Sequence, residues 1–313
     1  MNFADNLIKA IEEKQNPSVI GIDTDFEKIP VFLKEEYVKR DGNSLEAAAK
    51  CILEFNKKII DATKDVVPAV KIQMAFYEQY GHEGIWAFEE TVKYARNAGL
   101  MVIEDGKRND IGNTAKAYSI AHLGKTDVMG EKIAALDMDC LTINAYLGSD
   151  GVMPFIEECI EYGKGIFILV KTSNKSSGEL QDIETKKGQR VYEAMAEYVN
   201  KWGKNLIGRK GYSSVGAVVG ATYPTEAKRL REIMPNSIFL VPGYGVQGGS
   251  ADDVVPCFNK DGYGAIVNNS RGIIFAYQKT GNEKEYDKEA RKAAIAMKEA
   301  ITKSLKDAKI CAW

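Results

Sequence analysis

Residues 103–114 read Ile-Glu-Asp-Gly-Lys-Arg-Asn-Asp-Ile-Gly-Asn-Thr, and this stretch guides the interpretation of the whole chain. A short apolar segment precedes it, and an alanine-rich amphipathic segment follows it. Asp105, Lys107 and Asp110 therefore come at the end of a predicted buried strand. Charged groups are costly to place there unless they pair or take part in chemistry. Their position, more than their spacing, predicts a functional site at the carboxyl end of a strand.

Similar short apolar runs recur along the chain, and helical patterns separate most of them. Eight strands alternating with helices favour a (β/α)8 TIM barrel, with a doubly wound parallel sheet as the alternative. No linker, repeat or low-complexity tract interrupts the pattern, so we expect one domain over residues 1–313. The predicted strands are 18–23, 69–74, 101–105, 140–144, 165–170, 215–220, 237–241 and 265–268.

The helical patterns are long enough to cover the outside of such a barrel. An extra helix at about 185–209 is predicted as an insertion between the fifth and sixth strands, and 286–309 is predicted as the closing helix. The other predicted helices are 45–65, 84–98, 114–135, 150–162 and 224–234.

Composition excludes several classes of protein. The net charge of −2, with no basic block, argues against a nucleic-acid-binding protein. No long apolar run predicts a membrane span, and the first residues lack a secretory signal. Five widely spaced cysteines without a C-x-x-C motif are typical of reduced thiols in a cytoplasmic protein. Two histidines, His82 and His122, are too few for a histidine-rich metal site.

Charged residues of both signs gather at the predicted carboxyl ends of the first three strands, where barrels carry their function. Asp23 ends the first strand, Lys71 lies on the second, and Asp105, Lys107 and Asp110 follow the third. Flanking aspartates raise a lysine's pKa, so Lys107 would be a general acid rather than a Schiff-base nucleophile. The alternative is an ion-pair network with a purely structural role.

Glycine-rich loops follow the seventh and eighth predicted strands, at residues 242–249 and 269–272. Glycines let backbone N–H groups approach phosphate oxygens, and Arg271 can bind the same group, with Gln247 as a neutral donor. The alternative is that the glycines only make turns and Arg271 is solvated. The chain lacks a P-loop motif, which excludes a P-loop nucleotidase.

Six segments, in the same order along the chain, resemble the orotidine 5′-phosphate decarboxylase family. Residues 105–114 are similar to its D-x-K-x-x-D-I-G-x-T signature. The insertion at 185–209 and the run Asn-Ala-Tyr-Leu-Gly-Ser-Asp at 144–150 resemble the longer, type 2 subgroup. Relatives often have Asn-Pro where this chain has Asn174-Lys175, in the loop that would contact the base. The other similar segments are 19–23, 71–77, 170–174, 242–249 and 269–272.

The resemblance implies a role for each member of the charged group. Lys107 would protonate C6 of the pyrimidine as carbon dioxide leaves. Asp105 would face the substrate carboxylate and, with Lys71, hold Lys107 in place. Asp110 and Thr114 would reach the neighbouring subunit's site, which implies a homodimer with shared active sites. No metal and no organic cofactor is implied.

The resemblance also implies how the substrate, orotidine 5′-monophosphate, is bound, with 242–253 as a lid. Asp23 and Lys71 would bind the ribose hydroxyls. The base would be contacted by Thr172 and Ser173. The 5′-phosphate would be held by Pro242, Gln247, Gly248, Ser270, Arg271 and Gly272.

Three alternatives remain open at this stage. A related Mg²⁺-dependent sugar-phosphate decarboxylase or epimerase on the same barrel would share the D-x-K-x-x-D triplet. A non-catalytic nucleotide-phosphate-binding protein would use the charges as an ion-pair network. A Schiff-base aldolase would use a lysine as nucleophile.

Overall fold

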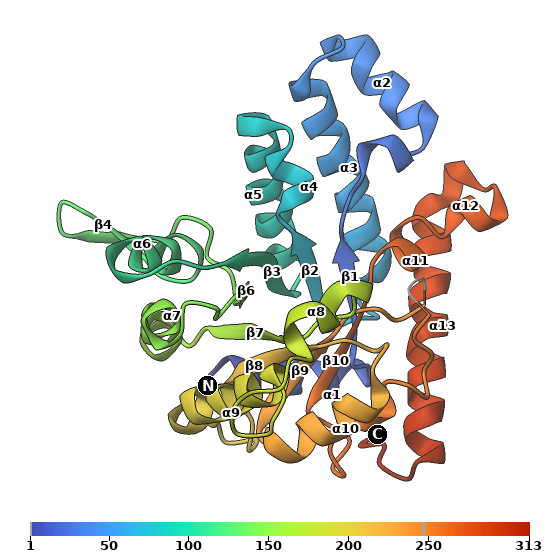
Figure 1. Cartoon of the computed structure of the whole chain (residues 1–313). Coiled ribbons are helices and arrows are strands. Elements are labelled where there is room, and N and C mark those ends of the chain that lie inside the picture. Colours follow the sequence, from blue (N-terminus) through green and yellow to red (C-terminus); the bar gives the residue numbers. More distant parts are fainter. Residues whose placement is uncertain (1, 246–247) are drawn as a thin grey trace.

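Eight parallel strands close into a barrel in the order β1-β10-β9-β8-β7-β6-β3-β2 (Figure 1). The computed structural model describes residues 2–245 and 248–313, and the barrel lies within these ranges. The predicted TIM barrel and each of its eight strands are confirmed, and the doubly wound sheet is wrong. The strands are β1 (Ser18–Ile22), β2 (Ala69–Gln73), β3 (Met101–Arg108), β6 (Cys140–Ile143), β7 (Gly165–Lys171), β8 (Ser213–Val219), β9 (Ser237–Val241) and β10 (Ala265–Asn269).

The barrel strands are short and apolar because water reaches neither of their faces. Every residue of β1, β8 and β9 is buried, since one face packs in the barrel interior and the other under helices.

The helices are α1 (Phe3–Lys14), α2 (Val31–Asp41), α3 (Leu45–Thr63), α4 (Ala75–Glu78), α5 (Gly81–Asn97), α6 (Gly112–His122), α7 (Ser149–Tyr162), α8 (Gly178–Gln181), α9 (Val191–Gly203), α10 (Pro224–Ile233), α11 (Arg271–Ile274), α12 (Tyr277–Thr280) and α13 (Tyr286–Asp307).

The helix α1, which the sequence analysis does not predict, closes the amino end of the barrel. Its apolar face joins the cluster that fills the barrel interior, and the Phe3 ring lies 6.0 Å from the Phe167 ring in an edge-on arrangement. Gly165 makes room for this contact, because a Cβ there would lie 2.2 Å from Phe3 Cδ1. The amino end is therefore packed, which leaves the carboxyl end of the barrel for a site.

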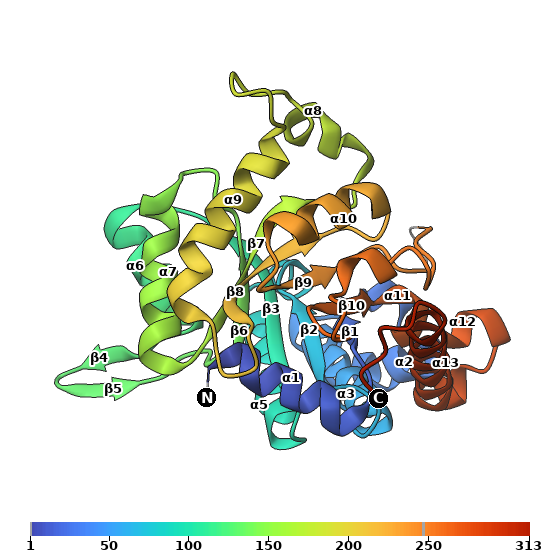
Figure 2. The ribbon, with the colours of Figure 1, turned by 90° about the horizontal axis from the view of Figure 1, so that it is seen from below.

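The prediction of a helix over 114–135 is wrong in its second half. Helix α6 ends at His122, and the strands β4 (Thr126–Val128) and β5 (Glu131–Ile133) form an antiparallel hairpin that projects from the barrel (Figures 1 and 2). Met129 and Gly130 at its tip have φ of +55° and +93°. Two successive positive φ values are the geometry of a type I′ turn, which suits the twist of a hairpin and ends the helical pattern.

The insertion between β7 and β8 contains less helix than 185–209. Helix α9 covers only Val191–Gly203, and the short helix α8 precedes it. Between them, Glu184 pairs with Arg190 in an antiparallel bridge. In Figure 2 this part of the chain extends beyond the barrel, whereas α9 runs along it.

The five cysteines are free thiols, as the sequence predicts, and Cys311 is the partly exposed one. Burial raises the pKa of Cys51 and of Cys257 to about 12. The four buried cysteines are Cys51, Cys140, Cys159 and Cys257. In the part of the chain that the structure describes, no helix is both long and apolar enough to span a bilayer.

Candidate active site

Asp105 is the centre of a continuous array of charges at the carboxyl end of the barrel. Its Oδ1 lies 2.6 Å from Lys107 Nζ, and its Oδ2 lies 2.9 Å from Lys71 Nζ. The Lys71 ammonium also contacts Asp23 Oδ1, at 3.2 Å. Three strands thus bring together four of the five charged residues that the sequence analysis selects, in alternating order of sign.

Two neutral side chains complete the surroundings of the Asp105 carboxylate. Gln73 Nε2 donates to Oδ2 at 3.1 Å, and Thr142 Oγ1 donates to Oδ1 at 2.9 Å. The same Thr142 hydroxyl accepts from the backbone N–H of Lys107 at 3.0 Å. Each carboxylate oxygen therefore has one cationic and one neutral donor, which fixes the orientation of Asp105.

The array keeps its charges although it is largely buried. The side chains of Lys71 and Asp105 are 4% and 13% exposed. Burial alone would lower the pKa of Lys71, but Asp105 and Asp23 outweigh it and hold this pKa above its usual value. Burial would raise the pKa of Asp105, but Lys71 and Lys107 hold it well below its usual range.

Lys107 combines an unusual backbone with an accessible ammonium. Its φ is +48°, and the pairing of β3 with β6 shifts register between Glu104 and Arg108. A non-glycine residue in this conformation costs about 1–3 kcal/mol and persists only where the surroundings impose it. The side chain is 46% exposed, so its ammonium is open to a substrate at the barrel mouth.

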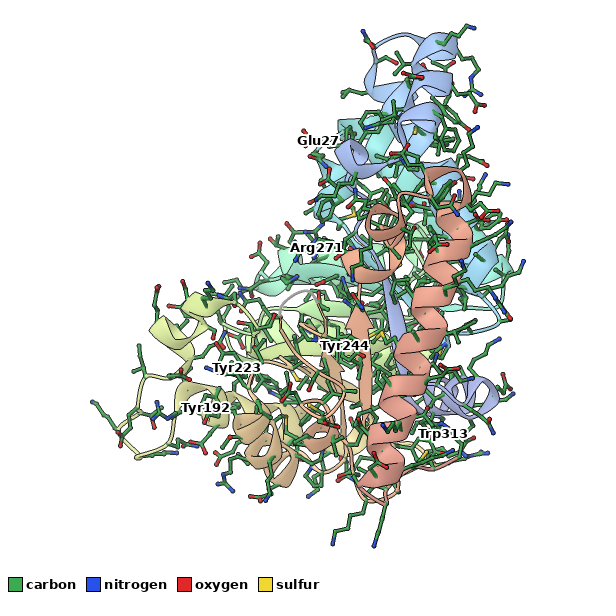
Figure 3. The ribbon with its side chains drawn as sticks, turned by 90° about the vertical axis from the view of Figure 1, so that its right-hand side faces the viewer. Glu27, Tyr192, Tyr223, Tyr244, Arg271 and Trp313 are labelled. Atoms are coloured by element: carbon green, nitrogen blue, oxygen red, sulfur yellow. The ribbon has the colours of Figure 1, made fainter. Side chains whose placement is uncertain are left out.

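A cavity of about 210 Å³ adjoins the array. Pro242, Ser270 and Arg271, three of the predicted phosphate ligands, line it together with Asp23, Lys71 and Asp105. Figure 3 shows Arg271 and Tyr244 on the segments that follow β10 and β9. Sequence reasoning missed Tyr244, Asn268 and Asn269 as site residues, although each lies within two residues of a predicted ligand.

The end of β10 approaches β1 closely at this cavity. A Cβ on Gly21 would lie 1.8 Å from Ser270 Oγ, so this approach requires glycine on β1. Next to it, Asn268 Nδ2 donates to Ser270 Oγ at 3.3 Å. Among the described residues, nothing is hydrogen-bonded to Asn268 Oδ1, which leaves this buried amide one free position beside the cavity.

The other predicted phosphate ligands lie on the two loops beside the cavity. Gly248 has a φ of +100°, and its N–H donates to Gly245 O at 2.9 Å. Gly272 lies under the Asn269 amide, where a Cβ would come within 2.8 Å of Asn269 Oδ1. The predicted ligand Gln247 lies outside the described residues.

Seven of the described predicted site residues do not line this cavity: Lys107, Asp110, Thr114, Thr172, Ser173, Gly248 and Gly272. Thr172 and Ser173 follow β7 and are partly exposed. Asp110 Oδ1 accepts from the next backbone N–H, that of Ile111, at 2.8 Å. Within the described residues, no hydrogen bond or ion pair links Asp110 to Lys107, and Thr114 is exposed on the first turn of α6. In a single chain, Asp110 and Thr114 therefore stand apart from the array.

Comparisons with known proteins agree with this geometry. The family model described as "Orotidine 5'-phosphate decarboxylase / HUMPS family" matches residues 48–286. An orotidine 5′-phosphate decarboxylase of Caldicellulosiruptor saccharolyticus is 44% identical over 97% of this chain and 99% of its own length.

Solved structures give the same picture. The structure of Leishmania donovani OMP decarboxylase superposes with a TM-score of 0.72 at 29% identity, covering 97% of this chain and 98% of that one. A Plasmodium yoelii protein titled as a putative orotidine-monophosphate-decarboxylase has a TM-score of 0.78 at 24% identity, over 97% of this chain and 100% of that one, and supports the fold. By sequence and by structure, this chain belongs to the orotidine 5′-phosphate decarboxylase / HUMPS family, in the longer subgroup that the sequence analysis expects.

Proposed function

We propose that the array of Asp23, Lys71, Asp105 and Lys107 decarboxylates orotidine 5′-monophosphate, with Lys107 as the proton donor. The reaction gives uridine 5′-monophosphate and carbon dioxide, and the enzyme is a carboxy-lyase of pyrimidine biosynthesis. The observation that carries this proposal is the 2.6 Å contact between Lys107 Nζ and the buried Asp105 carboxylate, beside a cavity lined by Arg271.

The chemistry explains why such an array is needed. When the bond between C6 and the carboxylate breaks, carbon dioxide leaves and the electron pair stays at C6, in the plane of the ring. No adjacent carbonyl delocalises that charge, so the protein must stabilise it electrostatically and supply a proton. A fixed ammonium does both, because it stabilises the carbanion and then transfers its proton to C6. Lys107 is left neutral and is protonated again from water.

The substrate spans the barrel mouth in this proposal. Its 5′-phosphate binds at Arg271, Ser270, Gly272 and the 242–249 loop, in the manner of a barrel phosphate site. Its ribose lies at Asp23 and Lys71, and its base lies toward Thr172 and Ser173. Phosphate binding far from C6 lets the 242–253 loop close, so that binding energy serves the chemical step.

The active site is shared between two chains in this proposal, and residues 1–313 act as one catalytic domain. Asp110 and Thr114 serve the partner's site. Within the described residues, no hydrogen bond or ion pair joins Asp110 to its own chain's array, which supports this, and so does Ile111, an apolar residue between Asp110 and Thr114 that is 53% exposed. The free cysteine thiols support a cytoplasmic location.

A steady-state assay tests the proposed reaction. We expect the purified protein to consume orotidine 5′-monophosphate, followed by the fall in substrate absorbance, at the same rate with and without EDTA. A rate that depends on added Mg²⁺ would instead favour the sugar-phosphate enzymes that share this barrel. Binding of nucleotide without turnover would favour the non-catalytic alternative.

A further inference from the structure

Two consecutive residues of the insertion between β7 and β8, which here includes α8, hold the end of strand β7. Gln181, at the end of α8, contacts Thr172 through both ends of its amide. Its Oε1 accepts from the backbone N–H of Thr172 at 3.0 Å, and its Nε2 donates to Thr172 Oγ1 at 2.7 Å. Thr172 Oγ1 in turn donates to Asn174 Oδ1 at 2.6 Å. A carboxamide can accept and donate at once, so these contacts fix both the backbone and the side chain of Thr172.

The neighbouring residue, Asp182, holds the residue before Thr172. Its Oδ1 lies 2.6 Å from the ammonium of Lys171, whose side chain is fully buried. The ammonium also faces two aromatic rings, with its Nζ 4.5 Å from the centre of Tyr223 and 5.4 Å from that of Tyr192. Figure 3 shows these two tyrosines on the α9 and α10 side of the molecule. Only the lysine of this ion pair is buried, since the Asp182 side chain is 37% exposed, and Asp182 together with the two rings holds the ammonium at the end of the strand.

Ser173 packs closely against Gly220, the residue that follows β8. A Cβ on Gly220 would lie 2.9 Å from Ser173 Cα and 3.0 Å from Ser173 N. Gly220 also donates its N–H to the Lys171 carbonyl at 2.8 Å. The backbone of the Lys171–Ser173 segment is therefore packed between β8 and the insertion, and the insertion contributes the side-chain contacts.

We propose that Gln181 is a positioning residue for base recognition. By holding Thr172, it presets Ser173 in the geometry that reads the edge of the pyrimidine ring. This inference rests on the proposed function, in which Thr172 and Ser173 contact the base. A segment that is ordered before binding loses no further conformational entropy when the ligand binds. The contacts of Gln181 with Thr172 therefore raise the affinity for the part of the ligand that Ser173 contacts. The insertion thus takes part in substrate recognition, although it lies outside the barrel.

The test compares a ligand that has a base with one that lacks it. Uridine 5′-monophosphate and ribose 5-phosphate are titrated by calorimetry against the full-length protein and against Gln181→Ala. We expect the Kd for uridine 5′-monophosphate to rise about tenfold or more, because a loosened segment must be ordered on binding. The Kd for ribose 5-phosphate should stay within about twofold, because its phosphate and ribose contacts are untouched.

Matched variants separate positioning from loss of structure. Glu179→Ala changes an exposed residue of the same short helix and should leave both Kd values unchanged. Gln181→Glu keeps an acceptor for the Thr172 N–H but loses the donor to Thr172 Oγ1, so its effect should be smaller than that of alanine. It also serves as the test variant if Gln181→Ala fails to fold.

Two results would overturn the inference: equal losses for both ligands in Gln181→Ala, or no loss for either. The proposed function fails separately, when the wild-type protein binds uridine 5′-monophosphate but does not turn over orotidine 5′-monophosphate.

Discussion

Replacing Lys71 by methionine tests how strongly the charge array depends on its buried cation. Methionine is similar in length and carries no charge. The substitution leaves Asp23 without its ammonium at 3.2 Å, whereas Asp105 keeps Lys107 at 2.6 Å and its two neutral donors. Removing one partner of a buried ion pair costs about 3–5 kcal/mol. The remaining contacts of Asp105 put the expected loss at the lower end of this range, about 3 kcal/mol.

That loss can be measured as a shift in thermal unfolding. For a chain of 313 residues it corresponds to a fall of about 5 °C in Tm. The matched control is Lys93→Met, in which the lysine side chain is 60% exposed and lies 2.8 Å from Glu90. An exposed pair of this kind contributes about 0.5 kcal/mol, so the control should melt within about 1 °C of wild type.

Activity gives a second measurement on the same variant. Lys71 holds Asp105, and Asp105 holds Lys107, so we expect kcat to fall about 10²- to 10³-fold, as when one preorganised electrostatic group is removed. A variant that melts like the control and keeps its kcat would refute the view that the array is a cooperative unit.

Four further predictions concern the same chain. Lys107→Ala should lower kcat by at least about 10³-fold while binding of uridine 5′-monophosphate persists in calorimetry; retained turnover would exclude Lys107 as the proton donor. Refolding inactive Lys107→Ala and Asp110→Ala chains together should restore about a quarter of wild-type activity, because half of the dimers are mixed and each mixed dimer has one intact site; no recovery would contradict a shared site. Because the pKa of Asp105 is lowered, its charged contacts stabilise the fold fully above about pH 4, and because the pKa of Lys71 is raised, its contacts do so fully below about pH 10. The Tm difference between wild type and Lys71→Met, measured across pH, should therefore be constant between these limits and shrink outside them. A thiol reagent should label Cys311 rapidly in the native protein and the four buried cysteines only after unfolding, as counted by mass spectrometry; fast labelling of a second thiol would argue against their burial.

The barrel could be predicted because buried parallel strands leave a simple pattern in the sequence. Each strand is a short apolar run, and the run can be recognised without knowledge of its neighbours. Strand β3 is longer than predicted, because Arg108 pairs with Ile143 of β6 beyond a register shift, and this pairing cannot be read from the local sequence. The type I′ turn at Met129-Gly130 is hard to predict because a single glycine is a weak interruption of a long helical pattern.

The site could be predicted in its charges but not in its supporting contacts. Asp105 and Lys107 can be recognised from the sequence because they are charged residues at the end of a strand. Thr142, by contrast, is an ordinary strand residue until β6 lies beside β3, and Gln181 acquires its role only when α8 folds back on β7. Contacts between residues distant in sequence arise from packing, and a single sequence carries little signal for them.

The closure of the barrel by α1 bears on the order in which the chain can fold during synthesis. The helix leaves the ribosome well before the strands that it packs against, since Asn2 at its N-cap donates to the carbonyl of Leu206, 204 residues later. At about 5–20 residues per second, that partner emerges on the order of 10–40 s after the helix. Throughout this interval the apolar face of α1 has no barrel to dock on. The nascent chain therefore carries α1 as an exposed hydrophobic helix until β8, β9 and β10 are made, which makes α1 a natural target for chaperones.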